Sequence, residues 1–319
     1  MTLRISLLLL AYNQAQVVEA AVRSCLAQEG EPLEIVLSDD ASTDATYSVL
    51  CDLASAYQGP HQVRVRRNPV NLGIGEHYNQ AIANSSGKLL VTAAGDDISL
   101  PHRVQTLAAA WDANGQTAEL IASHVIDMSS DGICGDVIRV DDLSRWSSAQ
   151  DWTRKRPHVI GASHAFTRRM HERFGSFSKD LSYEDQVMAL RACCMGGGIT
   201  VDEPLVQYRR GGVSAGAAKQ LGASQYLISQ ERKHVKQLAL FAQVNRDLIC
   251  AGLAQLWRGK VKRYHSRSQL ALQMLEAQDT WSRLTLPFQI PGAGWYWSCR
   301  HALKYEWCAR KARASEPTS

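Results

Sequence analysis

Short apolar runs alternate with segments whose apolar residues recur every three or four positions through the first 115 residues. The run Ile5–Leu10 predicts a strand buried on both faces, and the segment after it has the apolar spacing of a helix. Strict alternation of strand and helix predicts an α/β fold with a mostly parallel, Rossmann-like sheet flanked by helices. We expect strands at 4–12, 33–40, 63–69 and 88–94, and helices at 15–28, 45–57, 75–84 and 101–114.

The pattern changes after Ala118. Two strand-like runs flank SSDG at 129–132, which predicts a hairpin. Beyond Gly211-Gly212 the pattern is mostly helical, ending in the aromatic and basic segment WYWSCRHALKYEWCARKAR. These features predict a first domain over 1–212 and a helical region over 213–319. We expect strand-like runs at 119–128, 133–140, 159–169 and 199–210, and helices at 182–194, 224–258, 266–284 and from 294 onward.

Charge is distributed unevenly. Residues 254–319 carry eleven Lys/Arg and four Asp/Glu, a balance of +7, which leaves −3 for the first 253 residues of a chain with net charge +4. The slightly negative charge of the first 253 residues gives no reason to expect nucleic acid as a partner. The eight cysteines include no CxxC pair, and most lie among apolar neighbours, which favours buried free thiols and a reducing cytoplasm. We find no signal peptide pattern and no apolar run of membrane-spanning length.

Three predicted strands end in polar pairs, namely Tyr12-Asn13, Asp39-Asp40 and Asp96-Asp97. The carboxyl ends of parallel strands meet at one edge of a sheet, where ligands bind. Helix capping is the alternative for both Asp pairs, although Ser99 is better placed to cap the helix at Pro101. Two adjacent carboxylates beside a diphosphate favour a hard divalent ion, Mn²⁺ or Mg²⁺.

Four segments, in matching order, resemble the family 2 glycosyltransferases. They are LLLLAYNQAQVVEAAVRSCLAQ, LEIVLSDDASTDAT, NLGIGEHYNQAIANSSGKLLVTAAGDDISLPHRV, and YEDQVMALRA followed by EPLVQYRR. The resemblance implies the GT-A fold and transfer from a UDP-, dTDP- or GDP-sugar. It further implies a catalytic domain over 1–212, with a nucleotide-sugar half at about 1–115 and an acceptor half at about 116–212.

The resemblance also implies roles for individual residues of the nucleotide site. The second Asp of its pair, Asp40, would hold the nucleobase edge, with Asp39 beside it. The residues that would line or border the nucleotide are Ala11, Tyr12, Asn13, Asn71, Gly73 and Asn79.

Gly95-Asp96-Asp97 stands where the family has its DxD-type metal motif. Counting back from Pro101 favours Asp96 as the metal ligand, with Asp97 in the same site. Arg209 or Arg210, after VQY, is a candidate diphosphate ligand, with a solvated strand end as the alternative. Many members have Pro at the position of Ala11 and Asp at that of Ala94, which makes the metal ligand set of this chain unusual.

Asp185 matches the catalytic base of the family, with Glu184 as the second candidate. It would accept the proton of an acceptor hydroxyl that displaces the diphosphate with inversion. The same residues also fit a capping box with Ser182 as N-cap. A helix N-terminus at this point would lower the pKa of the Asp185 carboxyl. His164 could contact a sugar, but a lone histidine is more often structural.

The resemblance is compatible with a saccharide or polyprenyl-linked acceptor in cell-surface polysaccharide synthesis. In a helix from Gly294, Arg300, Lys304 and Lys311 share a face flanked by aromatic residues. Two interpretations stay open for this tail. It contacts the inner face of a membrane peripherally, or it packs on the catalytic domain or a second subunit. A nucleotide-sugar binder without catalysis is the alternative function, suggested by Ala94 and by the capping box.

Overall fold

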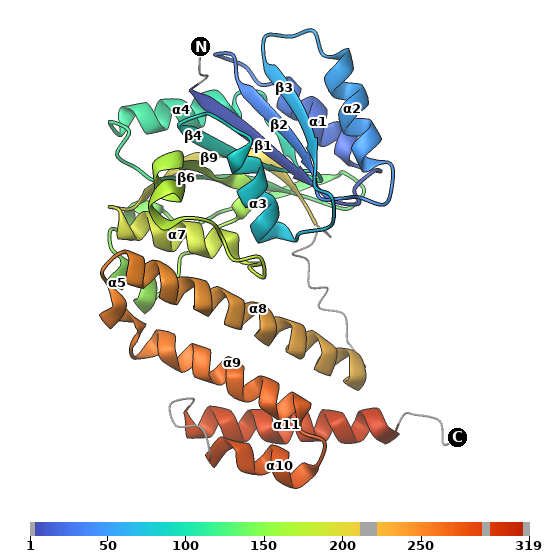
Figure 1. Cartoon of the computed structure of the whole chain (residues 1–319), viewed down its shortest axis with the longest axis vertical. Helices are drawn as coiled ribbons and strands as arrows, with labels where there is room; N and C mark the ends of the chain where they lie inside the picture. The colour runs from blue at the N-terminus through green and yellow to red at the C-terminus, as the bar shows by residue number, and fades with distance from the viewer. Residues whose placement is uncertain (1–3, 211–221, 289–293, 315–319) are drawn as a thin grey trace. The chain divides into compact units, whose positions relative to one another are not determined.

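The computed structural model describes residues 4–210, 222–288 and 294–314. The chain divides into two compact units, Met1–Gly216 and Ala217–Ser319 (Figure 1). The boundary expected at Gly212 lies outside the described residues.

The first part of the N-terminal unit alternates strands and helices, as the apolar pattern predicts. Every residue of β1 is buried, because helices cover both faces of the sheet at this strand. The elements are β1 (Ile5–Ala11), α1 (Val18–Leu26), β2 (Glu34–Asp39), α2 (Thr46–Ala56), β3 (Gln62–Arg67), α3 (Ile74–Ala83), β4 (Leu89–Ala94), β5 (Ile98–Ser99) and α4 (Arg103–Ala113).

The second part mixes strand directions, and its hairpin is confirmed by antiparallel pairing of β6 with β7. The strand-like run at 159–169 contributes only three residues to a strand, because a 3-10 turn precedes them and a helix begins at Arg168. The elements are β6 (Leu120–Met128), β7 (Cys134–Ile138), η1 (Leu143–Arg145), α5 (Ala149–Arg154), η2 (Gly161–Ser163), β8 (Ala165–Thr167), α6 (Arg168–Phe174), α7 (Glu184–Cys194) and β9 (Gly198–Arg209).

The strands form one mixed sheet in the order β3-β2-β1-β4-β8-β6-β9-β5, with β7 paired to β6. The first four strands are parallel, and β8 runs antiparallel to both of its neighbours. Alternate residues of the parallel strands face a core built with α1, α2 and α4, while α3 packs on the opposite face. The predicted α/β fold is thereby confirmed.

Ser99 does not cap the helix after Pro101, contrary to the expectation from its position. It lies in the short strand β5, and α4 has His102 as its N-cap without a side-chain hydrogen bond. The Ser99 hydroxyl instead accepts a hydrogen bond from Arg103 Nη1 at 2.9 Å.

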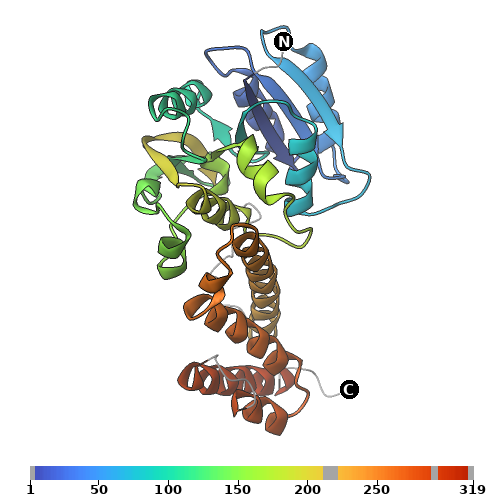
Figure 2. The same ribbon diagram turned by 60° about the vertical axis from the view of Figure 1, so that its left-hand side comes forward.

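The C-terminal unit is helical, as predicted. Its apolar centre includes Leu270, Met274 and Tyr305, and Figure 2 shows its long helices. Non-helical residues at 251–253 and 277–279 divide the two longer helices that the sequence suggested at 224–258 and 266–284. No helix in the described part of the chain is both long and apolar enough to cross a membrane. The elements are α8 (Ala223–Cys250), η3 (Ala254–Trp257), α9 (Lys260–Glu276), α10 (Thr280–Thr285), η4 (Leu286–Phe288) and α11 (Trp295–Ala314).

The cysteines are less uniformly buried than expected. Cys25, Cys193 and Cys308 are buried, whereas Cys134 and Cys250 are exposed, and all eight are free thiols.

Candidate functional site

The three polar strand ends lie side by side, because β1 sits between β2 and β4 in the parallel part of the sheet. Ala11 pairs with Asp39 across one side of β1, and Leu10 pairs with Ala94 across the other. Backbone hydrogen bonds extend both pairings by one residue, from Asp40 N to Ala11 O at 3.0 Å and from Gly95 N to Leu10 O at 2.9 Å. The sheet therefore brings Tyr12-Asn13, Asp39-Asp40 and Asp96-Asp97 to one edge.

Asn13 holds the loops after β1 and β2 together. Its backbone is left-handed, with φ at 50°, and its N–H donates to Ser42 Oγ at 2.9 Å. Its side-chain oxygen accepts from the Thr43 N–H at 2.8 Å. Tyr12, the preceding residue, is 40% exposed.

Asp40 is buried, and both of its carboxylate oxygens accept hydrogen bonds from the segment before α3. The donors are Asn68 Nδ2 at 2.6 Å, Leu72 N at 2.9 Å and Gly73 N at 3.0 Å. Asp40 therefore fixes the loop expected to border the nucleotide, in which Asn71 is exposed.

Asn79 lies on α3 and contacts the chain after α6. Its amide donates to the carbonyl oxygen of Phe177 at 2.9 Å and accepts from the Phe177 N–H at 2.8 Å. Asn79 thus joins α3 to the segment after α6 through two hydrogen bonds.

Asp39 is fully buried and incompletely paired. Its Oδ2 accepts from Ser42 N at 3.0 Å and lies 3.2 Å from Arg67 Nε. Its Oδ1 accepts no hydrogen bond from any residue that the structure describes. It does not cap α2, whose N-cap is Ala45.

The Gly95–Asp97 turn, or acid turn, is packed tightly against the end of β1. A β-carbon on Gly95 would lie 2.4 Å from Gln14 Oε1 and 2.9 Å from Ala11 Cβ, so only glycine fits here. Ala11 thus lies directly against the turn, whereas Ala94 is partly exposed.

Asp97 is the more buried residue of the acid pair, with 5% of its surface exposed. Its Oδ1 accepts from the Arg209 N–H at 2.8 Å, whereas its Oδ2 has no partner among the described residues. Burial and repulsion from Asp96 raise the pKa of Asp97 to about 7. Burial also raises the pKa of the half-buried Asp96, against the opposing effects of Arg209 and Gln14.

Arg209 joins the end of β9 to this turn. Its Nε donates to Asp96 O at 3.0 Å and its Nη1 donates to Ser130 O at 2.7 Å. The side chain of Arg210 points elsewhere and forms an ion pair with Asp127. Of the two arginines, Arg209 is the one at the acid turn.

Arg103 lies fully buried near the acid turn, and sequence reasoning did not identify it. Its Nη2 donates to Thr92 O at 2.7 Å and to Ala162 O at 2.6 Å, joining β4 to η2. Burial lowers the pKa of Arg103 to about 10, and its positive charge attracts Asp97. The sequence feature that could have indicated Arg103 is its position on the apolar face of α4.

His164 is fully buried. Neither ring nitrogen has a hydrogen-bond partner within the described ranges. Burial lowers the pKa of His164 to about 3, so its ring is neutral.

The candidate base lies at the start of α7. The helix begins at Glu184 with Tyr183 as an N-cap that makes no side-chain hydrogen bond, so the capping box with Ser182 is wrong. Asp185 Oδ1 accepts from the Gln186 N–H at 2.7 Å. Burial nevertheless raises the pKa of Asp185 to about 6, because it outweighs the expected lowering by backbone N–H groups at the helix N-terminus, including that of Gln186.

Gly161 connects this helix start to β4. A β-carbon on Gly161 would lie 3.1 Å from Glu184 Oε1 and 3.5 Å from Asp185 Cβ. The carbonyl of Gly161 accepts from Thr92 Oγ1 at 2.6 Å, two residues before the end of β4. The catalytic candidates therefore lie beside a segment that is hydrogen-bonded to β4, the strand before the acid turn.

The residues present could hold a divalent ion only with help from a ligand. The described residues contain no cluster of three or more His, Cys, Asp or Glu side chains arranged for a metal. Mg²⁺ commonly takes one or two carboxylates, and phosphate and water oxygens supply the rest. The unpaired Asp97 Oδ2 and the adjacent Asp96 fit that smaller protein contribution.

Comparison with known proteins places this geometry in context. Residues 6–173, more than half of the chain, match the family model described as glycosyl transferase family 2. The succinoglycan biosynthesis protein ExoO of Rhizobium meliloti is 34% identical over 38% of this chain and 33% of its own length. The putative glycosyltransferase EpsE of Bacillus subtilis is 26% identical over 32% of this chain and 36% of its own. The chain thus spans about a third of the length of these curated relatives.

Solved structures share the fold at low identity. Staphylococcus aureus TarS 1-349 in complex with UDP-GlcNAc has a TM-score of 0.56 at 13% identity, covering 98% of this chain and 93% of that one. The mannosyltransferase PcManGT of Pyrobaculum calidifontis, in complex with GDP-Man and Mn²⁺, has a TM-score of 0.52 at 18% identity, covering 96% and 88%.

The raised pKa of Asp97 predicts that removing the negative charge of this side chain stabilises the folded protein. The folded protein holds this proton more tightly than the unfolded chain, so ionisation of Asp97 costs stability as the pH rises from about 4 to above 7. We expect Asp97→Asn to increase the free energy of unfolding of the metal-free protein at pH 8 by about 2 kcal/mol. The gain should shrink toward pH 4. Urea unfolding at several pH values measures both effects.

The control for this experiment is Asp52→Asn on the exposed surface of α2, which also removes one negative charge. A variant Asp97→Asn that is less stable than the wild type at pH 8 would show that the Asp97 carboxylate stabilises the fold.

Proposed function

Since the chain belongs to glycosyltransferase family 2, we propose that it is an inverting, metal-dependent glycosyltransferase acting on a nucleoside diphosphate sugar. The observation that carries this proposal is the pair of unpaired, buried oxygens at neighbouring strand ends, Asp39 Oδ1 and Asp97 Oδ2. An unsatisfied buried acceptor costs about 1–3 kcal/mol, so two of them at one sheet edge favour a ligand that satisfies them.

Asp39 is better suited than Asp40 to recognise the nucleobase. Both oxygens of Asp40 are occupied by the loop before α3, whereas Asp39 retains a buried oxygen that can accept an N–H. A hydrogen bond from a base N–H to this oxygen would orient the nucleoside beside Tyr12. In this arrangement Asp40 positions the loop, and Asp39 contacts the base.

The diphosphate would lie at the Gly95–Asp97 turn. Asp97 and Asp96 would hold Mn²⁺ or Mg²⁺, which when bound supplies positive charge that stabilises the leaving diphosphate. The Arg209 N–H fixes the orientation of Asp97, and the Arg209 guanidinium keeps the turn against Ser130. The complex of PcManGT with GDP-Man and Mn²⁺ supports a divalent ion in this fold.

Asp185 would act as the general base. The acceptor hydroxyl gives its proton to the Asp185 carboxylate while its oxygen bonds to the anomeric carbon, and the bond from that carbon to the diphosphate oxygen breaks. Attack from the opposite face inverts the anomeric configuration. A carboxyl with a pKa of about 6 is mostly ionised at neutral pH and still accepts a proton effectively.

The acceptor would be a saccharide, either free or polyprenyl-linked, in cell-surface polysaccharide synthesis. The name of ExoO, a succinoglycan biosynthesis protein, supports this class. UDP-, dTDP- and GDP-sugars are the candidate donors, and the complexes of TarS and PcManGT contain two of these nucleotides. We place the reaction in the cytoplasm, with homo-oligomerisation as a further proposal.

A nucleotide-sugar binder without catalysis is the second candidate function. Ala94, where many family members have Asp, is the observation that favours it. The start of α7 does not favour this alternative, since its N-cap is Tyr183 and not Ser182.

The donor site predicts metal-dependent binding. Calorimetry with UDP-, dTDP- and GDP-sugars should find at least one that binds in the presence of Mn²⁺ or Mg²⁺ and binds at least tenfold more weakly with EDTA. Asp97→Asn should weaken that binding at least tenfold, whereas Asp52→Asn should not change it, because Asp52 lies on the exposed surface of α2. No binding of any donor with either ion would refute the proposed function.

The base assignment predicts a change in turnover without a change in donor affinity. Asp185→Asn should lower kcat for sugar transfer or slow donor hydrolysis by about 100-fold or more, because general-base catalysis contributes roughly 10² to 10⁴. The wild type should lose activity as the pH falls through about 6, since the base must be ionised. The pH profile should be measured at a saturating donor concentration. Ionisation of Asp96 and Asp97 in the donor-free enzyme then does not affect the measured rate.

Glu184→Gln is the matched control, because Glu184 precedes Asp185 on the same helix turn. Wild-type turnover by Asp185→Asn, or a larger loss in Glu184→Gln, would transfer the role of base away from Asp185.

A further inference from the structure

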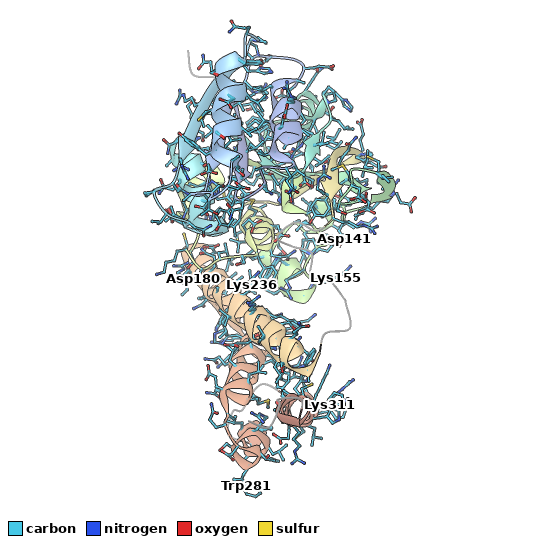
Figure 3. The ribbon with its side chains drawn as sticks, turned by 90° about the vertical axis from the view of Figure 1, so that its right-hand side faces the viewer. Asp141, Lys155, Asp180, Lys236, Trp281 and Lys311 are labelled. Atoms are coloured by element: carbon cyan, nitrogen blue, oxygen red, sulfur yellow. The ribbon has the colours of Figure 1, made fainter. Side chains whose placement is uncertain are left out.

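The outward side of α11 carries an unusual combination of side chains. Tyr296, Leu303 and Trp307 are 75%, 63% and 57% exposed. They share a helical face with two exposed cations, Arg300 and Lys311, because these five positions are three or four residues apart. The resulting α11 stripe extends over about 22 Å. In Figure 3, Lys311 projects outward from the helical unit.

The opposite side of α11 faces its own unit and is buried there. Ala302 and Tyr305 are fully enclosed and belong to the apolar centre of the helical unit. The α11 stripe is therefore a second apolar surface of the same helix, separate from the one that holds the unit together.

The charge on the stripe has a single sign. Glu306 is the sole acidic residue in the sequence of α11, and it is buried against α10. There it pairs with Arg283 at 2.5 Å and with Arg310 at 2.8 Å. Lys304, which is exposed beside the stripe, adds a further cation. No carboxylate on the helix offsets the positive charge of the stripe.

We infer that the α11 stripe binds an anionic lipid surface. Aromatic rings favour the headgroup level of a bilayer, and long basic side chains keep their charge in water while their stems lie on apolar surface. Lys311 already lies over the ring of Trp307, at 4.3 Å from its centroid, which places cation and ring at the same level of the helix.

A second copy of this chain fits the stripe less well. In a two-fold symmetric dimer the same surface meets itself, so Arg300, Lys304 and Lys311 would approach their own equivalents. Like charges facing each other oppose association, whereas anionic headgroups complement all three. This inference does not depend on the proposed transfer reaction, although a polyprenyl-linked acceptor would lie at the same surface.

Vesicle flotation of the full chain tests the inference. The wild type should float with vesicles that contain phosphatidylglycerol and should stay unbound with pure phosphatidylcholine. High salt should weaken the binding. The variant Arg300→Glu/Lys304→Glu/Lys311→Glu should bind at least tenfold more weakly, and so should Tyr296→Ser/Leu303→Ser/Trp307→Ser.

The matched control substitutes exposed residues of α8, Arg232→Glu/Lys233→Glu/Val235→Ser, and should float like the wild type. Circular dichroism checks that each variant is folded, and donor calorimetry reports the transferase unit separately from the lipid result. Three outcomes would overturn the inference. These are equal flotation with both vesicle types, wild-type binding by folded α11 variants, or a dimer in light scattering that the α11 substitutions dissociate while vesicles remain unbound.

Discussion

Carboxylates buried at the carboxyl ends of neighbouring parallel strands are the constraint on which the site depends. Three strands in fixed parallel register place the ends of β2 and β4 on either side of β1. Their aspartates lie where the sheet excludes water, so each carboxylate needs donors or a positive charge nearby. The surrounding protein satisfies Asp40 completely, but it leaves one oxygen of Asp39 and one of Asp97 unpaired.

Two arginines from distant parts of the chain stabilise the buried negative charge of this acid turn. Arg209 supplies a backbone N–H to Asp97 and holds the carbonyl of Asp96, while Arg103 contributes positive charge from the interior. Arg103 also joins Thr92 and Ala162, so the same side chain fixes β4 relative to η2, against which the start of α7 packs. Arg103 consequently links the strand before the acid turn to the segment that lies beside Glu184 and Asp185.

Much of the fold could be predicted from local patterns, because period-two and period-3.6 spacing are properties of short segments. The meeting of three polar strand ends also followed from the parallel sheet. The different hydrogen bonding of Asp39 and Asp40 could not be predicted, since it depends on donors from Asn68, Leu72 and Gly73 that only the folded loop supplies. Arg103 and the raised pKa of Asp185 were missed for the same reason: burial is a property of the assembled structure. The family resemblance was confirmed by the family model, whereas the individual site roles stay predictions.

The central claim is that the unpaired oxygen of Asp97 receives a metal ion together with a nucleoside diphosphate. Anomalous diffraction from crystals grown with Mn²⁺ and a nucleoside diphosphate would locate the ion directly. We expect a manganese peak at coordination distance, about 2 Å, from a carboxylate oxygen of Asp97 or Asp96, in contact with the diphosphate. A diphosphate bound at another part of the sheet, or a manganese peak away from both aspartates, would contradict the account.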